Sequence, residues 1–181
     1  SEITTRCQNM FLDNANLLKK LTFPRLCLPI TVLVSGLLNF TIVFGLFTAF
    51  LVLTENFPGL VYFAILPLLA LLVVFATSLG IVLGVLNVFF RDVGQFYGIF
   101  VTFWFWLTPI VYPASILPER LQALMDINPL APLIAAIQTV LVRGEWPQWS
   151  SLMYPLAMAF GLCIFGIMIF RKHAAEMVDE L

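Results

Sequence analysis

Four long apolar stretches constrain this chain more than any other feature of its sequence. They cover residues 28–53, 60–86, 93–112 and 152–170, and none has an Asp, Glu, Lys, Arg or His in its interior. A helix needs about 20 mostly apolar residues to cross the hydrocarbon core of a bilayer. Because 61% of the 181 residues are hydrophobic, most of the chain cannot be hidden inside a water-soluble domain. The sequence therefore predicts an all-α polytopic membrane protein, a single transmembrane domain with four transmembrane helices.

The basic residues indicate how these helices are oriented. Before the first stretch and after the last stand Arg6, Lys19, Lys20, Arg25, Arg171 and Lys172. The loop TENFPG between the first two stretches has no basic residue. Since Lys and Arg gather on the cytoplasmic side of short loops, we expect both ends of the chain in the cytoplasm, together with the turn that holds Arg91 and Asp92.

Local signals mark the ends of the second and third helices. Asn87 stands where the second helix should end, and Asp92 followed by Gln95 resembles a capping box that opens the third. Pro109 should kink the third helix near its outer end. The signals at Asn87 and Asp92 predict a tight turn between the second and third helices.

Small and polar residues inside the stretches predict contacts between helices. Gly80 and Gly84 have the spacing that lets two helices approach closely. Asn39 and Thr108 are among the few polar side chains in the stretches, and such groups usually bond to neighbouring helices in a bundle.

The segment from Pro113 to Ser150 is too long for a turn and not apolar enough for a further span. PERLQALMDI begins with Pro118, which suits the first turn of a helix. It ends at Asn128 and Pro129, because a residue before proline avoids the helical region. LAPLIAAIQTVLVRG follows, with an apolar face at helical spacing formed by Leu130, Leu133, Ile134, Ile137 and Leu141. At about a dozen residues this helix is too short to cross the bilayer, so a re-entrant or interfacial hairpin over about 117–143 is predicted on the outer side.

Several functions are disfavoured by what the sequence lacks. It has no Gly-x-x-x-x-Gly-Lys-Ser/Thr loop, so ATP and Mg are expected on another subunit and no cofactor is expected on this chain. The only histidine, His173, has no Cys beside it, which disfavours a metal site or a histidine-based catalytic site. A net charge of −1 without a basic run disfavours nucleic acid as a partner. The absence of ionisable groups inside the spans disfavours an ion-coupled transporter.

The third stretch is unusually rich in aromatic residues. FYGIFVTFWFW, residues 96–106, holds seven rings in eleven positions. Some rings are expected to face lipid or neighbouring helices, as is ordinary in membrane proteins. An aromatic stripe along a passage would also suit a sugar ring, whose C–H face can rest on an aromatic face. Both explanations remain open for each ring.

Four blocks of the sequence resemble the membrane subunit of ABC-2 type exporters of lipid-linked polysaccharides, the family that exports O-antigen, capsule and teichoic-acid polymers. The blocks are LLKKLTFPRLCLP (17–29), LNVFFRDVGQF (86–96), FWLTPIVYP (105–113) and INPLAPLI (127–134). The family subunit has six transmembrane helices. The resemblance implies that the four helices here are the last four, and that the chain is an N-terminally truncated form lacking roughly the first two.

The resemblance also implies roles for particular residues. Docking on the ATPase subunit falls to Asn16, Leu17, Lys19, Lys20, Phe23, Pro24, Arg91 and Asp92. The sugar conduit is lined by Tyr97, Phe100, Trp104 and Trp106. The outer gate is formed around Glu119, Asp126, Asn128 and Pro129. The family implies a homodimer in the bacterial inner membrane, two ATPase partners and a polyprenyl-diphosphate-linked glycan as cargo.

Two alternatives remain beside this interpretation. One is an ABC-2 exporter of a drug or a lipid. The other is a polytopic membrane enzyme that acts on lipid-linked sugars, for which Glu119 and Asp126, seven residues apart on one predicted helix, are the only pair of acids worth naming.

Overall fold

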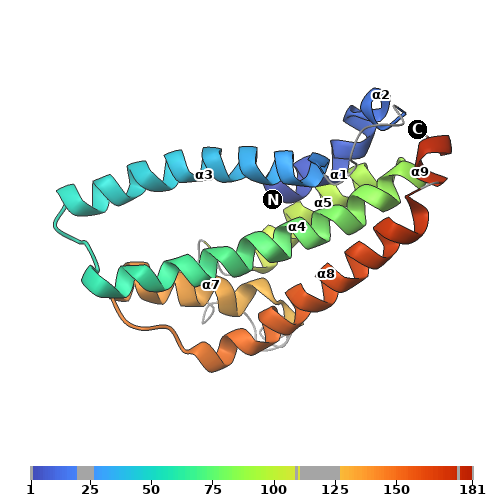
Figure 1. Cartoon of the computed structure of the whole chain (residues 1–181). Helices are drawn as coiled ribbons and strands as arrows, with labels where there is room; N and C mark the ends of the chain where they lie inside the picture. The colour runs from blue at the N-terminus through green and yellow to red at the C-terminus, as the bar shows by residue number, and fades with distance from the viewer. Residues whose placement is uncertain (1, 20–26, 109, 111–126, 175, 181) are drawn as a thin grey trace.

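A computed structural model describes residues 2–19, 27–108, 110, 127–174 and 176–180. The described residues form helices joined by turns and short connections (Figure 1). In chain order the elements are α1 (Glu2–Asp13), α2 (Ala15–Leu18), α3 (Cys27–Leu53), η1 (Gly59–Ala64), α4 (Ile65–Phe89), α5 (Val93–Leu107), α7 (Leu130–Gln138), η3 (Thr139–Arg143), η4 (Trp149–Leu152), α8 (Met153–His173) and α9 (Glu176–Glu180). The all-α fold class predicted from the sequence is confirmed for this part of the chain.

Three of the four predicted stretches form helices that are long and apolar enough to cross a membrane. They are α3, η1 continued by α4, and η4 continued by α8, with 27, 31 and 25 residues. Their bounds lie within a few residues of the predicted ones. Apolar side chains over most of the surface of α3, such as Ile42 and Leu46 at 65% and 69% exposed, fit a lipid environment.

The third predicted span is shorter than expected. Helix α5 ends at Leu107 and has 15 residues, about 22 Å at 1.5 Å per residue, whereas the prediction continued the helix to Tyr112. Thr108 is extended, with φ −99° and ψ 128°, because a residue that precedes a proline is pushed out of the helical region. The described residues therefore hold three candidate spans and two shorter apolar helical segments, Val93–Leu107 and Leu130–Arg143.

The N-terminal residues form a helix that packs on the bundle with one face buried. Helix α1 lies along α4 and also contacts α3. Its inner face buries Thr4, Cys7, Gln8 and Phe11, and the Phe11 ring stacks on Phe170 of α8 at 5.6 Å. This burial was not predicted, because polar residues dominate the composition of the segment.

Glycines let α1 approach α4 closely, as their spacing predicts. A Cβ at Gly80 would lie 2.5 Å from the Cβ of Cys7, and one at Gly84 would lie 2.8 Å from the Cys7 carbonyl oxygen. Neither position has room for a larger residue without displacing α1, which confirms a packing role for both glycines.

The core of the bundle has two parts, one toward each end. Toward the end that carries α2 and α9, which we call the α2 end, the buried residues include Cys7, Phe11, Val85 and Phe170. Toward the other end, which we call the α7 end, α7 packs on the start of α4 through Leu133 and its neighbours. The apolar stripe of α4 thus has a different partner in each half.

The second helix of the predicted outer hairpin is present. It runs through α7 and a π-helical turn, η3, and stops at Gly144, which has a φ of +67°, the left-handed conformation that commonly ends helices. The predicted apolar face is partly wrong. Leu133 is buried as predicted, but the other deeply buried residues are Ala136 and Val140, which were not assigned to that face. The predicted first helix of the hairpin lies outside the described residues.

The turn between α4 and α5 forms where it was predicted, but by different contacts. Asp92 occupies the N-cap position and its side chain makes no capping hydrogen bond, so the predicted capping box is wrong. The Oδ1 atom of Asn87 instead accepts a hydrogen bond from the N–H of Gly94 at 3.0 Å. Helix α4 also runs past Asn87 to Phe89. A side chain of the preceding helix therefore caps α5.

Candidate functional site

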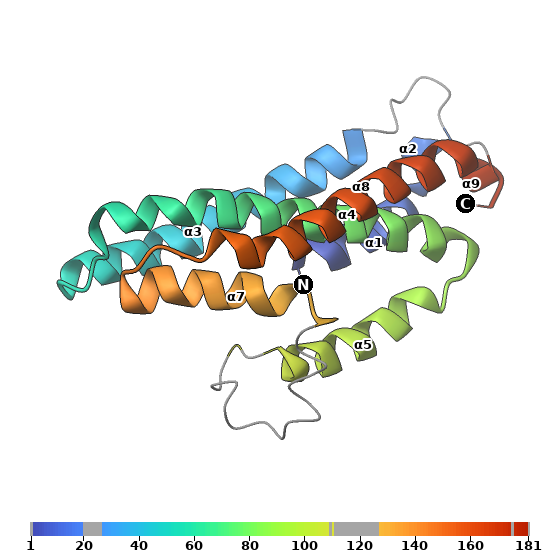
Figure 2. The same ribbon diagram turned by 90° about the horizontal axis from the view of Figure 1, so that it is seen from below.

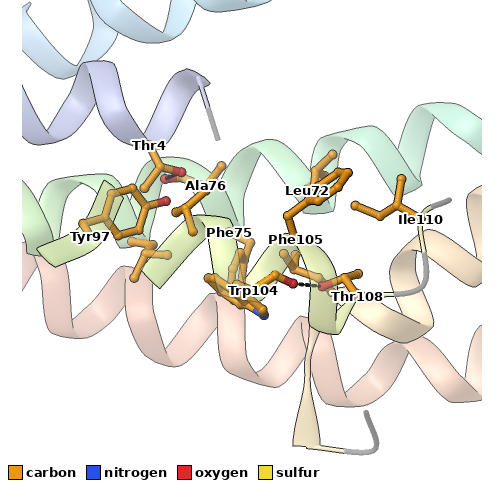
Figure 3. Close-up of a pocket in the computed structure, with 12 residues that line it drawn as sticks. Thr4, Leu72, Phe75, Ala76, Tyr97, Trp104, Phe105, Thr108 and Ile110 are labelled. Carbon is orange, nitrogen blue, oxygen red and sulfur yellow. Dashed lines mark hydrogen bonds between the residues drawn. The ribbon is translucent and has the colours of Figure 1, made fainter. Parts of the chain in front are cut away.

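A cavity of about 330 Å³ lies between α4 and α5 (Figure 3). The residues that line it are mostly apolar: Thr4, Leu72, Phe75, Ala76, Leu79, Tyr97, Val101, Trp104, Phe105, Thr108, Ile110 and Leu130. Two of the four predicted conduit residues, Tyr97 and Trp104, are among them. In Figure 3 the hydroxyl group of Tyr97 points toward Thr4 of α1. Two of the few polar side chains that line the cavity therefore lie close together on a mostly apolar wall.

Trp104 is held in place from two sides. Its indole Nε1–H donates a hydrogen bond to Oδ1 of Asn128 at 2.9 Å. Its ring meets Phe75 of α4 edge to face, with 6.3 Å between centroids. The indole N–H is therefore occupied by a protein acceptor, and what the ring offers to a ligand in the cavity is apolar surface.

Asn128 connects the end of α5 to the start of α7. It is 5% exposed, its Nδ2 donates to Oγ1 of Thr108 at 2.9 Å, and its Oδ1 also accepts from the N–H of Leu130 at 3.0 Å. We call Trp104, Thr108 and Asn128 the Asn128 network. The structure thus brings together Trp104, predicted for the conduit, and Asn128, predicted for the outer gate.

The other two predicted conduit residues do not line this cavity. Phe100 is 53% exposed, although its ring lies 5.1 Å from that of Trp104. Trp106 is 63% exposed and packs edge to face on Phe105 at 5.8 Å. The aromatic residues of α5 are therefore spread over several faces of the helix.

The predicted docking residues that the structure describes lie at the α2 end. Asn16 and Leu17 belong to α2, Lys19 follows it, and Arg91 and Asp92 form the exposed α4–α5 turn. Figures 1 and 2 both place α2 at the same end as α9 and the end of α4. Lys20, Phe23 and Pro24 lie outside the described residues.

Asn87 joins these docking elements, a role that the sequence did not indicate. Besides capping α5, its Nδ2 donates to Oδ1 of Asn9 at 3.3 Å and to the carbonyl oxygen of Gln8 at 3.4 Å. The side chain is 2% exposed. One buried amide therefore ties α1, which leads into α2, to the turn that carries Arg91.

The residues proposed for an enzyme or a gate are only partly described. Glu119 and Asp126 lie outside the described residues. Pro129 is buried at the N-cap of α7. His173 donates to or accepts from Glu176, with Nδ1 and Oε2 2.6 Å apart. Within the described ranges no group of three or more His, Cys, Asp or Glu residues is placed to hold a metal ion.

An ion pair joins Glu2 and Arg6 one helical turn apart on α1. Arg6 Nη2 lies 2.7 Å from Oε1 of Glu2, and Nδ2 of Asn39 on α3 donates to both carboxylate oxygens at 3.1 and 3.2 Å. The predicted bond of Asn39 to a neighbouring helix is confirmed. Its partner is an ionised group that the predicted spans do not contain.

Comparison with known proteins identifies the family. The model of the ABC-2 type transporter family matches residues 1–142. Over 173 residues the chain is 30% identical to an O-antigen export system permease protein RfbA of Klebsiella pneumoniae and 30% identical to the protein of that name in Myxococcus xanthus. These matches cover 94% and 93% of this chain but 66% of each relative, so the chain spans slightly less than two thirds of their length. From the residues matched by the family model, the chain belongs to the ABC-2 type transporter family.

Proposed function

We propose that this chain is a transmembrane subunit of an ATP-driven exporter that moves lipid-linked polysaccharide across the bacterial inner membrane. The observation that carries the proposal is the similarity, along 94% of the chain, to permease proteins whose names specify O-antigen export. Those names favour a glycan over a drug or another lipid as the cargo. The protein acts as a transport subunit, and an ATPase partner binds and hydrolyses ATP with Mg.

The α2 end supports the part of the proposal that concerns the ATPase. Exposed polar residues of two separate elements lie at one end of the bundle: Asn16 in α2 with Lys19 just after it, and Arg91 and Asp92 in the α4–α5 turn. Asn87 bonds α1, which leads into α2, to the start of α5, which follows the α4–α5 turn. In this proposal the α2 end and the C-terminus face the cytoplasm, where the ATPase docks.

The cavity beside α5 supports the part that concerns the glycan. Two copies of the subunit enclose the conduit, and aromatic residues hold each sugar by weak contacts. A contact worth on the order of 1 kcal/mol suits a moving chain, because stronger binding would stop it.

An ATPase is expected to copurify with the protein. The whole protein would be expressed with its neighbouring genes, purified in mild detergent and assayed for vanadate-sensitive ATP hydrolysis. Equal amounts of the two proteins in one peak, together with loss of surface glycan when the gene is deleted, are the expected result. A chain that purifies alone and supports full glycan export would contradict the proposal and would direct attention to an enzyme or another exporter.

Removing the rings at Trp104 and Phe100 is expected to lower export severalfold without preventing copurification of the ATPase. The matched control is Phe103→Ala: this residue of the same helix is 72% exposed and has no described ring contact with Trp104, whereas the Phe100 ring lies 5.1 Å from that of Trp104. Surface glycan would be measured in cells that contain equal amounts of each variant. Equal export by Trp104→Ala/Phe100→Ala and the control would show that these rings do not guide the cargo.

A further inference from the structure

The side-chain amide of Gln8 is buried where α1, α4 and the start of α5 meet. Gln8 is 2% exposed, and its Oε1 atom has no hydrogen-bond partner among the described residues. A buried acceptor without a partner lowers the stability of a fold, because its desolvation is not offset by a new bond. Asn87, beside it, is also 2% exposed. Both side chains are enclosed within this chain, so no segment outside the chain can reach them in this arrangement.

Three amide atoms gather beside Gly94, the second residue of α5. A Cβ placed on Gly94 would lie 2.8 Å from Nε2 of Gln8, 3.3 Å from Oδ1 of Asn87 and 3.7 Å from Nδ2 of Asn87. The N–H group of Gly94 donates to the Asn87 oxygen at 3.0 Å. Side-chain amides of α1 and α4 therefore lie beside one backbone N–H group of α5, and the amide of α4 accepts from it.

This N–H group depends on an acceptor from another helix. The first N–H groups of a helix have no partner within it, and Asp92 at the N-cap position of α5 makes no capping side-chain hydrogen bond. The terminal torsion of a glutamine side chain is broad and roughly two-fold. Turning the Gln8 amide over about its Cγ–Cδ bond would exchange Nε2 and Oε1. A carbonyl oxygen would then stand beside Gly94, where the nitrogen lies now.

We propose that Gln8 is a reserve cap for α5. In this structure Asn87 of α4 accepts from the Gly94 N–H; in a second arrangement the turned amide of Gln8 accepts from it, so that α5 is bonded to α1. Glycine at position 94 leaves room for the exchange, since a side chain there would meet the Gln8 amide. The cavity lies between α4 and α5. A start of α5 that keeps a cap while it leaves α4 lets the two walls of this cavity move apart.

Hydrogen exchange of the Gly94 amide tests whether Gln8 can replace Asn87. The whole protein would be compared with Asn87→Ala, Gln8→Met and the double variant, by mass spectrometry of fragments that cover the start of α5. Methionine resembles glutamine in helix propensity and is unbranched, but has no amide. Gln8→Met alone should change the exchange rate by less than about twofold, because Asn87 still caps α5. Asn87→Ala should raise it moderately, and loss of both amides at least about tenfold more, because no acceptor remains.

Equal exchange rates in Asn87→Ala and in the double variant would overturn the proposal. The melting temperature in detergent is an independent check, which needs no folded Asn87 variant. Gln8→Met should melt about 2–4 °C higher than the unaltered protein, because it removes a buried acceptor that has no partner. An unchanged or lower melting temperature would show that the Gln8 amide is already satisfied, and would also overturn the reserve cap. The packing control is Met10→Leu, at a residue of α1 that is 1% exposed; it should leave the exchange rate and the melting temperature nearly unchanged. Neither measurement depends on the cargo of the exporter.

Discussion

Replacing Gly80 with alanine is expected to destabilise the protein and loosen α1 from the bundle. The added Cβ would meet the Cβ of Cys7 at 2.5 Å, and the Cα and carbonyl oxygen of Thr4 at 3.2 Å each. These are atoms of the backbone or next to it, so rotation of a side chain cannot relieve the clash and α1 must shift as a unit. Overpacking of this kind costs about 1–3 kcal/mol, more than the gain of up to about 1 kcal/mol from alanine in a helix.

Gly45→Ala and Gly161→Ala are the matched controls for this prediction. Both glycines lie inside long helices, and a Cβ at either would meet nothing within 4 Å. They should therefore leave the melting temperature in detergent unchanged or raise it, since alanine is the better helix former. If Gly80→Ala melted at the temperature of these controls, the close approach of α1 to α4 would be wrong.

Hydropathy predicts the long helices because their apolar surface faces lipid over most of its circumference. The bounds of α3 and α8 follow from composition alone, and Gly80 and Gly84 are recognisable because close helix packing needs small residues at that spacing. The early end of α5 was also foreseeable, since Thr108 precedes Pro109 and the residue before a proline leaves the helical region.

Helix α1 was not predicted from the sequence, because the mean hydropathy of this segment is low. What marks it as a helix is the regular spacing of its apolar residues. Polar residues such as Glu2, Arg6 and Asp13 lower the mean hydropathy of the segment, whereas Thr4, Cys7 and Phe11 still follow a helical period on the buried face. A search for amphipathic periodicity would have found the helix. It would not have placed the helix beside the middle of α3 and α4, because that position depends on the contacts of Thr4 with Ala76 and of Glu2 with Asn39.

The contacts of Asn87 and Asn128 are tertiary, and no local rule predicts them. Asn87 replaces the expected capping box by reaching Gly94 seven residues ahead, across the turn. Asn128 meets Trp104, 24 residues away in the chain. Asn87 was predicted to end the second helix, which instead continues to Phe89, and Asn128 was predicted to end a helix and to belong to an outer gate. The partners of both residues depend on how the helices pack.

Replacing Asn128 with alanine is expected to have the largest effect at the α7 end. The change removes the acceptor of the Trp104 N–H, a partner of Thr108 and the acceptor of the Leu130 N–H. Each buried polar group left without a partner costs about 1–3 kcal/mol, so a clear loss of thermal stability in detergent is expected. Trp104→Phe keeps a ring in place and removes only the indole donor, so its effect should be smaller.

A double-mutant cycle separates the Asn128 network from general loss of packing. If the hydrogen bond between Trp104 and Asn128 stabilises the protein, the effects of Asn128→Ala and Trp104→Phe on the free energy of unfolding should be non-additive by about 0.5–3 kcal/mol. The control pairs Asn128→Ala with Trp146→Phe, because the Trp146 ring is 60% exposed and makes no contact with Asn128 among the described hydrogen bonds; these effects should add. Additivity in both cycles would mean that α5 and α7 are held together without this bond. Coupling in the first cycle alone would establish that the bond between Trp104 and Asn128 joins the cavity wall to the start of α7.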